Sequence, residues 1–201
     1  MSDASGREER LRDQLAFVLE ADALKSVIRR NYLADGSRPE NTAEHSWTLA
    51  LMAIVLAEHA VEPVDVGKVV KMVVLHDLVE VDAGDTYIYD PAAVAGQAER
   101  EALAADRIFG LLPEDQGPAL RALWEEFEEG TSPEARFGRA VDRMAGFLLN
   151  HASEGRTWRQ YGVTADRVGG MLAKVEAGSP ALYAEASRRL AQAVTDGYLD
   201  P

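Results

Sequence analysis

Val73-Val74-Leu75-His76-Asp77-Leu78-Val79-Glu80 is the stretch that decides the interpretation of this chain, because it reads as a buried helix containing three ionisable residues. Burial of an unpaired charge is costly, so packing alone does not explain these residues. On a helix, Glu80 lies three residues after Asp77 and four after His76, so all three side chains can face one pocket. His76 and Asp77 leave the helix about 100° apart, which lets both reach a single ion. Taken alone, the pair fits a satisfied buried His–Asp contact equally well.

The composition limits the class of protein. The chain has 201 residues, of which 47% are hydrophobic, enough for one domain with a sizeable core. It has no cysteine, which excludes disulfides and thiolate metal sites and fits a reducing cytoplasm. The polar start and the charges that interrupt every apolar run predict neither a signal peptide nor a membrane span. A net charge of −13 argues against a nucleic acid polymer as partner, but it allows a small anion at a local site.

Helical periodicity dominates from end to end and no convincing alternating strand is present, so we expect an all-α fold. Helices are predicted over residues 7–21, about 24–31, 42–60, 64–81, 94–111, 115–129, 133–152, 164–177 and 180–196. Asn41 and Glu44 have the spacing of a capping box, and Ser132-Pro133 and Ser179-Pro180 are typical helix starts. The helix over 42–60 is apolar almost all round, as expected for a central helix.

Four residues from three otherwise apolar helices can form one metal site: His45, His76, Asp77 and Asp142. Two imidazoles and two carboxylates are a plausible ligand set for a divalent ion, with positions left for water and a substrate oxygen. Glu80, one turn after His76, is within reach of such a water as a general base. The loop that follows carries Asp85 and is well placed for chemistry.

The same residues carry a resemblance to a known family. They stand in the order H…HD…D, within the stretches Arg38-Pro-Glu-Asn-Thr-Ala-Glu-His45-Ser, His76-Asp77-Leu-Val-Glu80-Val-Asp-Ala-Gly84-Asp85 and Pro133-Glu-Ala-Arg-Phe…Asp142. Over about residues 20–150 the chain resembles the HD-domain superfamily of metal-dependent phosphohydrolases. Within it, the chain is most similar to the branch of bacterial 5′-nucleotidases that act on deoxyribonucleoside monophosphates.

The resemblance implies roles for individual residues. His45, His76, Asp77 and Asp142 would hold one divalent metal (Mn, Co, Fe, Ni, Zn or Mg), and Glu80 and Asp85 would act in catalysis. Substrate would be contacted by Arg30, which orients the phosphate, and by Asn31, Asp77, Asp85, Thr86, Tyr87 and Ile88. Two positions depart from the branch: Asn31 stands where a Trp is usual, and Thr86-Tyr87-Ile88 replaces a turn that contains Pro and Thr.

From this resemblance we expect a single HD domain over residues 1–201, with a core of about 20–155 and C-terminal helices of about 160–197. We also expect a cytoplasmic homodimer that hydrolyses nucleoside 5′-monophosphates. Two alternatives stay open: hydrolysis of another phosphate ester, such as a cyclic nucleotide, a nucleoside triphosphate or an alarmone, and a non-catalytic module with a structural metal. Arg29, Lys25 and Arg38 could extend a phosphate-binding spot, although Arg38 could pair with Glu40 or Glu44 instead.

Overall fold

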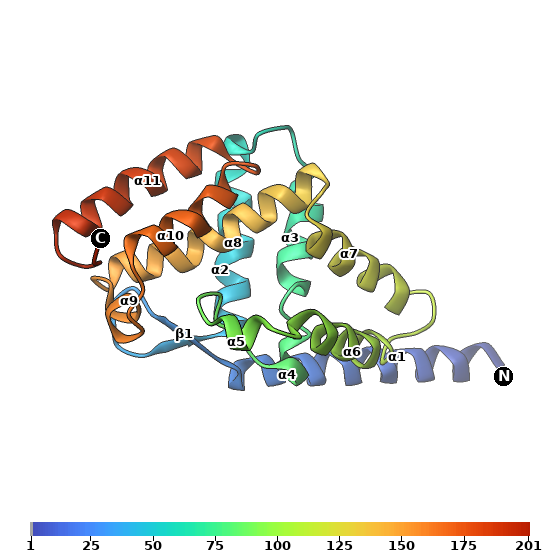
Figure 1. Ribbon diagram of the computed structural model, residues 1–201. Helices are drawn as coiled ribbons and strands as arrows, with labels where there is room; N and C mark the ends of the chain where they lie inside the picture. Colours follow the sequence, from blue (N-terminus) through green and yellow to red (C-terminus); the bar gives the residue numbers. More distant parts are fainter. Residues whose placement is uncertain (1) are drawn as a thin grey trace.

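The computed structural model describes residues 2–201, with side chains from residue 5 onward, and it is built almost wholly of helices (Figure 1). Its elements in chain order are α1 (Ser2–Ala21), η1 (Asp22–Ser26), β1 (Ile28–Tyr32), β2 (Pro39–Asn41), α2 (Thr42–Leu56), η2 (Ala57–His59), α3 (Val66–Leu75), α4 (Glu80–Ala83), α5 (Pro91–Val94), α6 (Gln97–Phe109), α7 (Gly117–Glu129), α8 (Pro133–Ala152), α9 (Arg156–Gln160), α10 (Ala165–Leu172), η3 (Ala173–Val175) and α11 (Pro180–Thr195). The all-α prediction is therefore confirmed.

The centre of the bundle is formed by α2, α3 and α8, which pack against one another. Each contributes side chains with no exposed surface, for example Leu49, Met72 and Val141. The helices α10 and α11 cover the other side of α8, and their Val168 and Ala186 belong to the same hydrophobic cluster. In Figure 1, α8 passes across α2 toward α3.

A second hydrophobic cluster lies beneath the His76-Asp77 pair. Leu75, Leu78 and Val79 pack there with α6 and with Trp124 of α7. The indole Nε1 of Trp124 donates a hydrogen bond to the carbonyl oxygen of His76 at 3.1 Å. The stretch around His76 is therefore buried on its apolar side, as its sequence predicts.

The helix predicted over 64–81 is interrupted. The helix α3 ends at Leu75, and the next residues form tight turns before α4 begins at Glu80. The amide of Leu78 donates to the carbonyl of Leu75, and the amide of Glu80 donates to that of Asp77. Bonds to the third residue back are those of a 3₁₀ turn, which places residues three apart in line. Asp77 and Glu80 consequently lie on the same side of the turn.

The helix predicted over about 24–31 is also wrong in its second half. The segment forms the short helix η1 and then strand β1, which pairs antiparallel with β2 through Ile28 and Asn41 and through Tyr32 and Pro39. Local apolar spacing favoured a helix, but pairing with a strand across the 33–38 turn gives the backbone other hydrogen-bond partners. The hairpin is the only named sheet in the described part of the chain. The five-residue helix α9 was not predicted.

Three predicted helix starts are confirmed. Asn41 Oδ1 accepts a hydrogen bond from the Glu44 amide at 2.9 Å, and Glu44 Oε2 accepts one from the Asn41 amide at 3.1 Å. This reciprocal capping box begins α2. Ser132 and Ser179 accept bonds from backbone amides at the starts of α8 and α11, each followed by Pro.

Two helices expose apolar faces, and one of them is α2, which is central as predicted and apolar on its exposed side too. On α2 the exposed fractions of Trp47, Leu51, Ile54 and Val55 are 68%, 46%, 60% and 60%. We call these four side chains the α2 stripe. The α1 stripe consists of Leu11, Leu15, Val18 and Leu19, which are 55–74% exposed.

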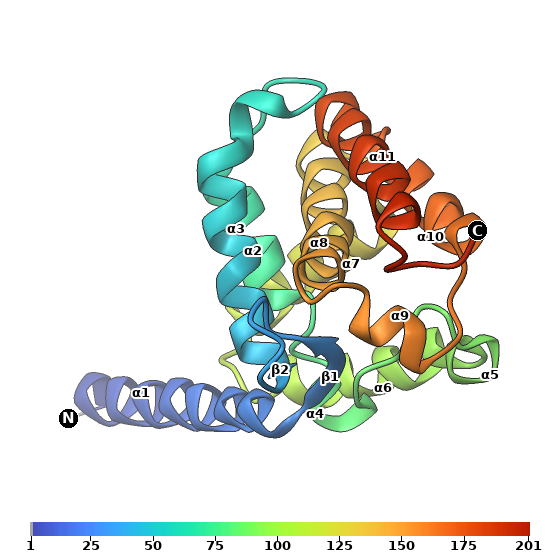
Figure 2. The same ribbon diagram turned by 90° about the vertical axis from the view of Figure 1, so that its left-hand side faces the viewer.

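The helix α1 projects from the body of the molecule like an arm (Figure 2). Its attachment to the rest of the chain includes the ion pair between Arg10 and Asp115, and the hydrogen bond between the Gln14 and Gln116 side chains. In the part of the chain that the structure describes, no helix combines the length and hydropathy that crossing a membrane requires.

Candidate active site

Four side chains predicted as metal ligands come together where α2, α3 and α8 meet. One nitrogen or oxygen atom from each of His45, His76 and Asp142 lies within 4.8 Å of the others. Asp77 completes the group, because its Oδ1 lies 2.9 Å from His76 Nε2 and its Oδ2 lies 4.0 Å from His45 Nε2. The fold therefore gathers two imidazoles and two carboxylates around one point, although they lie far apart in the sequence.

The ring of His76 has a fixed orientation. Its Nδ1 lies 2.8 Å from the carbonyl oxygen of Val73, and a carbonyl can only accept, so Nδ1 carries a hydrogen. This leaves Nε2 directed at Asp77, and the ring of Phe127 packs against the imidazole with 4.9 Å between centroids. Burial alone would lower the pKa of His76, but the carboxylates of Asp77 and Asp142 raise it to about 9. A backbone bond at the far nitrogen is the usual support of a metal-binding histidine.

His45 is fully buried between two acids. Its Nε2 lies 3.0 Å from Asp142 Oδ1, and its Nδ1 lies 3.4 Å from Oε1 of Glu40, which is itself only 2% exposed. Burial and the positive charge of Arg29 lower the pKa of His45, and its bonds to the two acids raise it above its usual value. Sequence reasoning considered Glu40 only as a partner for Arg38. Arg38 instead pairs with Glu44, as the alternative interpretation had it.

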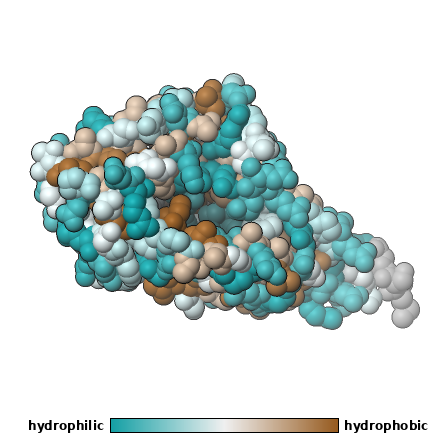
Figure 3. All heavy atoms as spheres, in the orientation of Figure 1, coloured by the Kyte–Doolittle hydropathy of each residue, from teal (hydrophilic) through white to brown (hydrophobic). Residues whose placement is uncertain are grey.

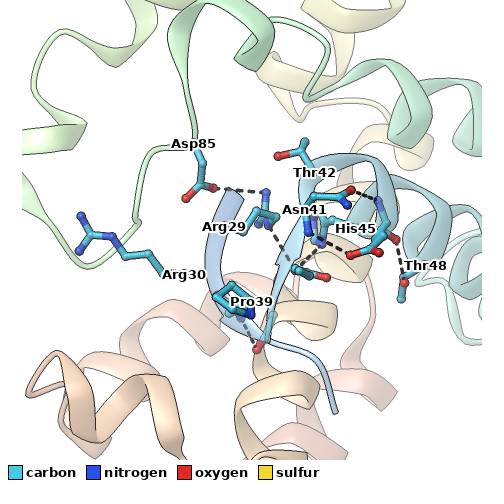
Figure 4. Close-up of polar contacts among 12 residues, drawn as sticks. Arg29, Arg30, Pro39, Asn41, Thr42, His45, Thr48 and Asp85 are labelled. Atoms are coloured by element: carbon cyan, nitrogen blue, oxygen red, sulfur yellow. Dashed lines mark hydrogen bonds and ion pairs between the residues drawn. The ribbon is translucent and has the colours of Figure 1, made fainter. Parts of the chain in front are cut away.

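The guanidinium of Arg29 lies among the carboxylates of the site. Its Nη1 is 3.5 Å from Asp85 Oδ1 (Figure 4). The same atom is 3.1 Å from Asp77 Oδ2, and Nε is 3.3 Å from Glu40 Oε1. Burial lowers the pKa of Arg29, but Asp77, Asp85 and Glu80 together hold it well above the ordinary value. The sequence had suggested Arg29 only as an extension of a phosphate spot. An internal cation of this kind limits the repulsion between the acids.

Arg30, predicted to orient the substrate phosphate, packs on Tyr87 of the cavity wall and does not itself line the cavity. Its guanidinium stacks between the rings of Tyr87 and Tyr161, at 4.7 Å from each centroid, and it is well separated from Arg29 in Figure 4. Side chains alternate between the two faces of a strand. On β1 this alternation directs Arg29 and Asn31 into the site and leaves Arg30 on the other face.

Glu80 and Asp85, the predicted catalytic acids, both lie at the site. Oε2 of Glu80 accepts a hydrogen bond from the Thr42 hydroxyl at 2.8 Å. Burial and the neighbouring charge of Asp77 raise the pKa of Glu80 to about 9. Burial also raises the pKa of Asp85, although Arg29 opposes it. Gly84 has a φ of 72°, which lets the chain turn between α4 and Asp85.

These groups open into a cavity of about 570 Å³. A hollow is visible near the middle of the molecular face shown in Figure 3. The cavity walls include the predicted residues Asn31, His76, Asp77, Glu80, Asp85, Thr86, Tyr87, Ile88 and Asp142. They also include four side chains that sequence reasoning did not find: Arg139, Arg143, Met171 and Lys174. Met171 and Lys174 lie beyond about residue 150, outside the stretches that carry the sequence motifs, so no motif could have identified them.

Comparison with known families and structures agrees with this geometry. Residues 21–183 match the family model of the HD domain. A crystal structure described as a predicted metal-dependent phosphohydrolase from Magnetospirillum magnetotacticum MS-1 has a TM-score of 0.93 and 48% sequence identity, and it covers 97% of this chain and 98% of that chain. The PH0347 protein from Pyrococcus horikoshii OT3 has a TM-score of 0.61 at 24% identity, over 87% of this chain and 99% of its own, which shows a shared fold alone.

Among curated proteins, similarity is to deoxynucleotidases. The 5′-deoxynucleotidase HDDC2 of Homo sapiens is 31% identical over 144 residues, which is 71% of this chain and 68% of that protein. The protein of the same name from Danio rerio is 28% identical over 143 residues, or 71% of this chain and 70% of that protein. The family model matches residues 21–183, which is most of this chain, and the H…HD…D residues lie close together in the structure. The chain therefore belongs to the HD-domain family.

Proposed function

We propose that the protein is a metal-dependent phosphomonoesterase that releases phosphate from ribo- or deoxyribonucleoside 5′-monophosphates. The observation that carries the proposal is the convergence of His45, His76, Asp77 and Asp142 beside two buried acids, in a cavity large enough for a small ligand. Its support from relatives is the similarity to proteins named 5′-deoxynucleotidase and to a predicted metal-dependent phosphohydrolase.

The four donors fit one divalent ion. His76 presents Nε2 to the group because its Nδ1 is bonded to the backbone, and His45 presents its Nε2, 3.0 Å from Asp142 Oδ1, while its Nδ1 faces Glu40. With two nitrogen and two oxygen donors and no thiolate, Mn, Fe, Co, Ni, Zn and Mg are all candidates. A bound divalent ion would lower the pKa of a water and offset the charge of a phosphate ester.

The chain's own acids would manage the protons. Glu80 lies on the cavity wall beside Asp77, and we assign it to accept the proton of the attacking water. Its hydrogen bond from Thr42 holds the carboxyl group in place. Asp85, which lies 3.5 Å from the same Arg29 Nη1 that is 3.9 Å from Glu80, would protonate the leaving alkoxide or position the water. A binding module with a structural metal needs neither acid, so their placement favours an enzyme.

The nucleoside part of the substrate would lie along the loop after α4. Thr86, Tyr87 and Ile88 line the cavity there, and half of the Ile88 surface is exposed. Tyr87 is buried and its hydroxyl has no partner in the described structure. A buried hydroxyl without a partner is available to a polar group of a ligand.

A panel of phosphate esters tests the function. The protein is freed of metal with a chelator, then reloaded separately with Mn, Co and Mg, and phosphate release is measured. We expect 5′-monophosphates of nucleosides to be the preferred substrates. Preference for a cyclic nucleotide, a nucleoside triphosphate or an alarmone would replace the proposed substrate class. The His76→Ala and Asp77→Ala variants serve as controls, because each should lose the metal and all activity.

We also propose that the protein is a homodimer formed through the two apolar stripes. The α1 and α2 stripes leave eight large apolar side chains 46–74% exposed, and pairing with a second copy would bury them. Sedimentation should give twice the chain mass of 21.9 kDa, and a clean monomer would reject the proposal.

Domain organisation and location are further proposals. We infer that residues 1–201 form a single domain, with a core of about 20–155 and C-terminal helices of about 160–197, because α10 and α11 share the core cluster of α8. The absence of cysteine supports a cytoplasmic location. Limited proteolysis that released a stable fragment shorter than the chain would contradict a single domain.

A further inference from the structure

Four cationic side chains line the cavity of this strongly acidic protein: Arg29, Arg139, Arg143 and Lys174. Two of them are already engaged. Arg29 is within 4.0 Å of Asp77, Asp85, Glu80 and Glu40. Arg139 donates to the carbonyl oxygens of Phe127 and Glu128 at the end of α7, and lies 3.5 Å from the Glu128 carboxylate. The guanidinium groups of Arg29 and Arg139 are therefore both engaged by protein groups and less available to a ligand.

Arg143 differs from both. Its Nη1 donates to the carbonyl oxygen of Arg139 at 2.9 Å, while its Nε is buried and has no hydrogen-bond partner. Among the side chains of residues 5–201, no carboxylate lies within ion-pair distance of its guanidinium. Burial lowers the pKa of Arg143, and a guanidinium still keeps its proton in proteins. A partly buried charge of this kind is stabilised when an anion binds.

Lys174 is the second cation without a partner. It lies on η3, which packs against α8, and no ion pair or hydrogen bond of its side chain is found over the described range. The neighbouring acids of the cavity are occupied elsewhere: Glu101 accepts a hydrogen bond from Gln97 at 2.6 Å, and Glu128 faces Arg139. Two positive charges without an ion-pair partner in the described chain thus line the cavity, and the carboxylates of Asp142 and Glu128 act on Arg143 only from beyond ion-pair distance.

We propose that Arg143, assisted by Lys174, is the anion subsite that binds the phosphoryl oxygens of the substrate. This inference rests on the proposed function and assigns to Arg143 the role that the resemblance gave to Arg30. Arg143 follows Asp142 directly on α8, so its Cα lies next to the predicted metal ligands. Its planar guanidinium can donate hydrogen bonds to two phosphate oxygens at once. Lys174 adds a single charge from η3, which packs against α8.

Variants of Arg143 and Arg30 distinguish the two assignments. Arg143→Gln and Arg143→Met remove the charge and keep most of the side-chain volume, and Arg30→Gln tests the alternative. Arg188→Gln is the matched surface control, because Arg188 is exposed on α11 and pairs with Glu185 outside the cavity. Each metal-loaded protein is assayed for metal content, for kcat and KM on a nucleoside 5′-monophosphate, and for inhibition by inorganic phosphate and by the neutral nucleoside.

We expect both Arg143 variants to keep their metal and to raise KM and the inhibition constant of phosphate by about 10- to 100-fold, the usual effect of losing hydrogen bonds to a charged group. Inhibition by the neutral nucleoside should not change, whereas a structural disturbance would weaken it too. Lys174→Gln should raise the phosphate constant by about two- to fivefold, because an exposed charge contributes less.

The inference is overturned if phosphate inhibits the Arg143 variants as well as it inhibits the unaltered protein, or if Arg30→Gln carries the loss instead. An equal loss of phosphate and nucleoside binding would also overturn it. If the unaltered protein hydrolyses no phosphate ester, the proposed function fails. Calorimetric titration of the metal-loaded proteins with inorganic phosphate then still tests Arg143, since this measurement needs no turnover.

Discussion

We propose Glu80 as the general base of the metal-loaded protein, in which a divalent ion beside the carboxyl group would favour its ionised form, and Glu80→Gln tests that role. The amide keeps the shape of the side chain and its contact with Thr42, but it cannot take a proton. The variant should keep its metal and its substrate affinity while kcat falls by about 10² to 10⁴, the usual contribution of acid–base catalysis. Metal content and turnover at saturating metal are the two measurements.

A purely supporting role for Glu80 predicts a different pattern. If the residue only orients a metal ligand, the variant should lose metal affinity by about 10- to 100-fold, and added metal should restore turnover. Full activity at saturating metal would therefore remove Glu80 from the catalytic residues.

The same residue gives the metal-free protein a pH dependence. In the folded chain the pKa of Glu80 is raised to about 9 by burial first and by Asp77 second, from an ordinary value of 4.5. Between these values the unfolded chain has lost a proton that the folded chain keeps, so the free energy of unfolding falls as pH rises through this window. Glu80→Gln lacks this titration.

Urea unfolding of both proteins in chelator, at steps across that window, checks this expectation. The stability of Glu80→Gln relative to the unaltered chain should rise with pH and level off above about pH 9. A difference that does not change with pH would show that the Glu80 carboxyl is not protonated in the folded, metal-free state.

At the scale of single elements, the capping box of α2 links stability to the site. Asn41→Ala removes the side-chain oxygen that accepts from the Glu44 amide. The loss should be about 1 kcal/mol of stability, or about 2–4 °C in Tm for a chain of this size. His45 lies in the same first turn, so we also expect weaker metal binding.

Ser132→Ala is the matched control for this prediction. It removes the equivalent cap of α8, but Asp142 lies more than two turns further along that helix. Its Tm should fall by a similar amount while metal affinity stays unchanged. Calorimetry and metal titration of both variants separate the two effects, and equal metal affinities would show that the α2 cap does not support His45.

The elements also show what the sequence can and cannot predict. Local signals were sufficient for the helix starts at Asn41, Ser132 and Ser179, because a cap depends on residues only a few positions apart. The strand β1 could not be found this way, because its partner β2 lies across a turn and its apolar spacing resembles a helix. The strand matters for the site, because it places Arg29 among the acids and Arg30 on the tyrosine rings.

The same distinction holds for the candidate site as a whole. The four metal-type residues and the two acids could be predicted from motif order, since they are polar residues in otherwise apolar segments. Arg143 and Lys174 could not, because nothing in their local sequence separates them from surface cations. Their relevance depends on their lack of an ion-pair partner inside the cavity, and only the folded structure shows that.

At the scale of the whole molecule, the apolar stripes predict a homodimer. One charged substitution within a stripe should separate the two copies. Ile54 is 60% exposed on the α2 stripe, so Ile54→Glu should leave the fold of a single chain intact while its charge opposes burial at an interface. We expect this variant to sediment as a monomer. Leu103→Glu is the matched control, because Leu103 is 66% exposed on α6, outside both stripes. Equal masses for the two variants would contradict the proposed interface.

The hairpin of β1 and β2 also has an evolutionary consequence. Neighbouring residues of a strand face opposite sides of it. If the 33–38 turn gained or lost one residue and the strand shifted by one position, Arg29 and Arg30 would exchange places. One of them would lie among Asp77, Asp85 and Glu40, and the other between Tyr87 and Tyr161. Two consecutive arginines make such a length change tolerable, since a cation would still reach the acids of the site. Relatives with hairpins of different length can therefore use arginines that do not align with each other for the same purpose.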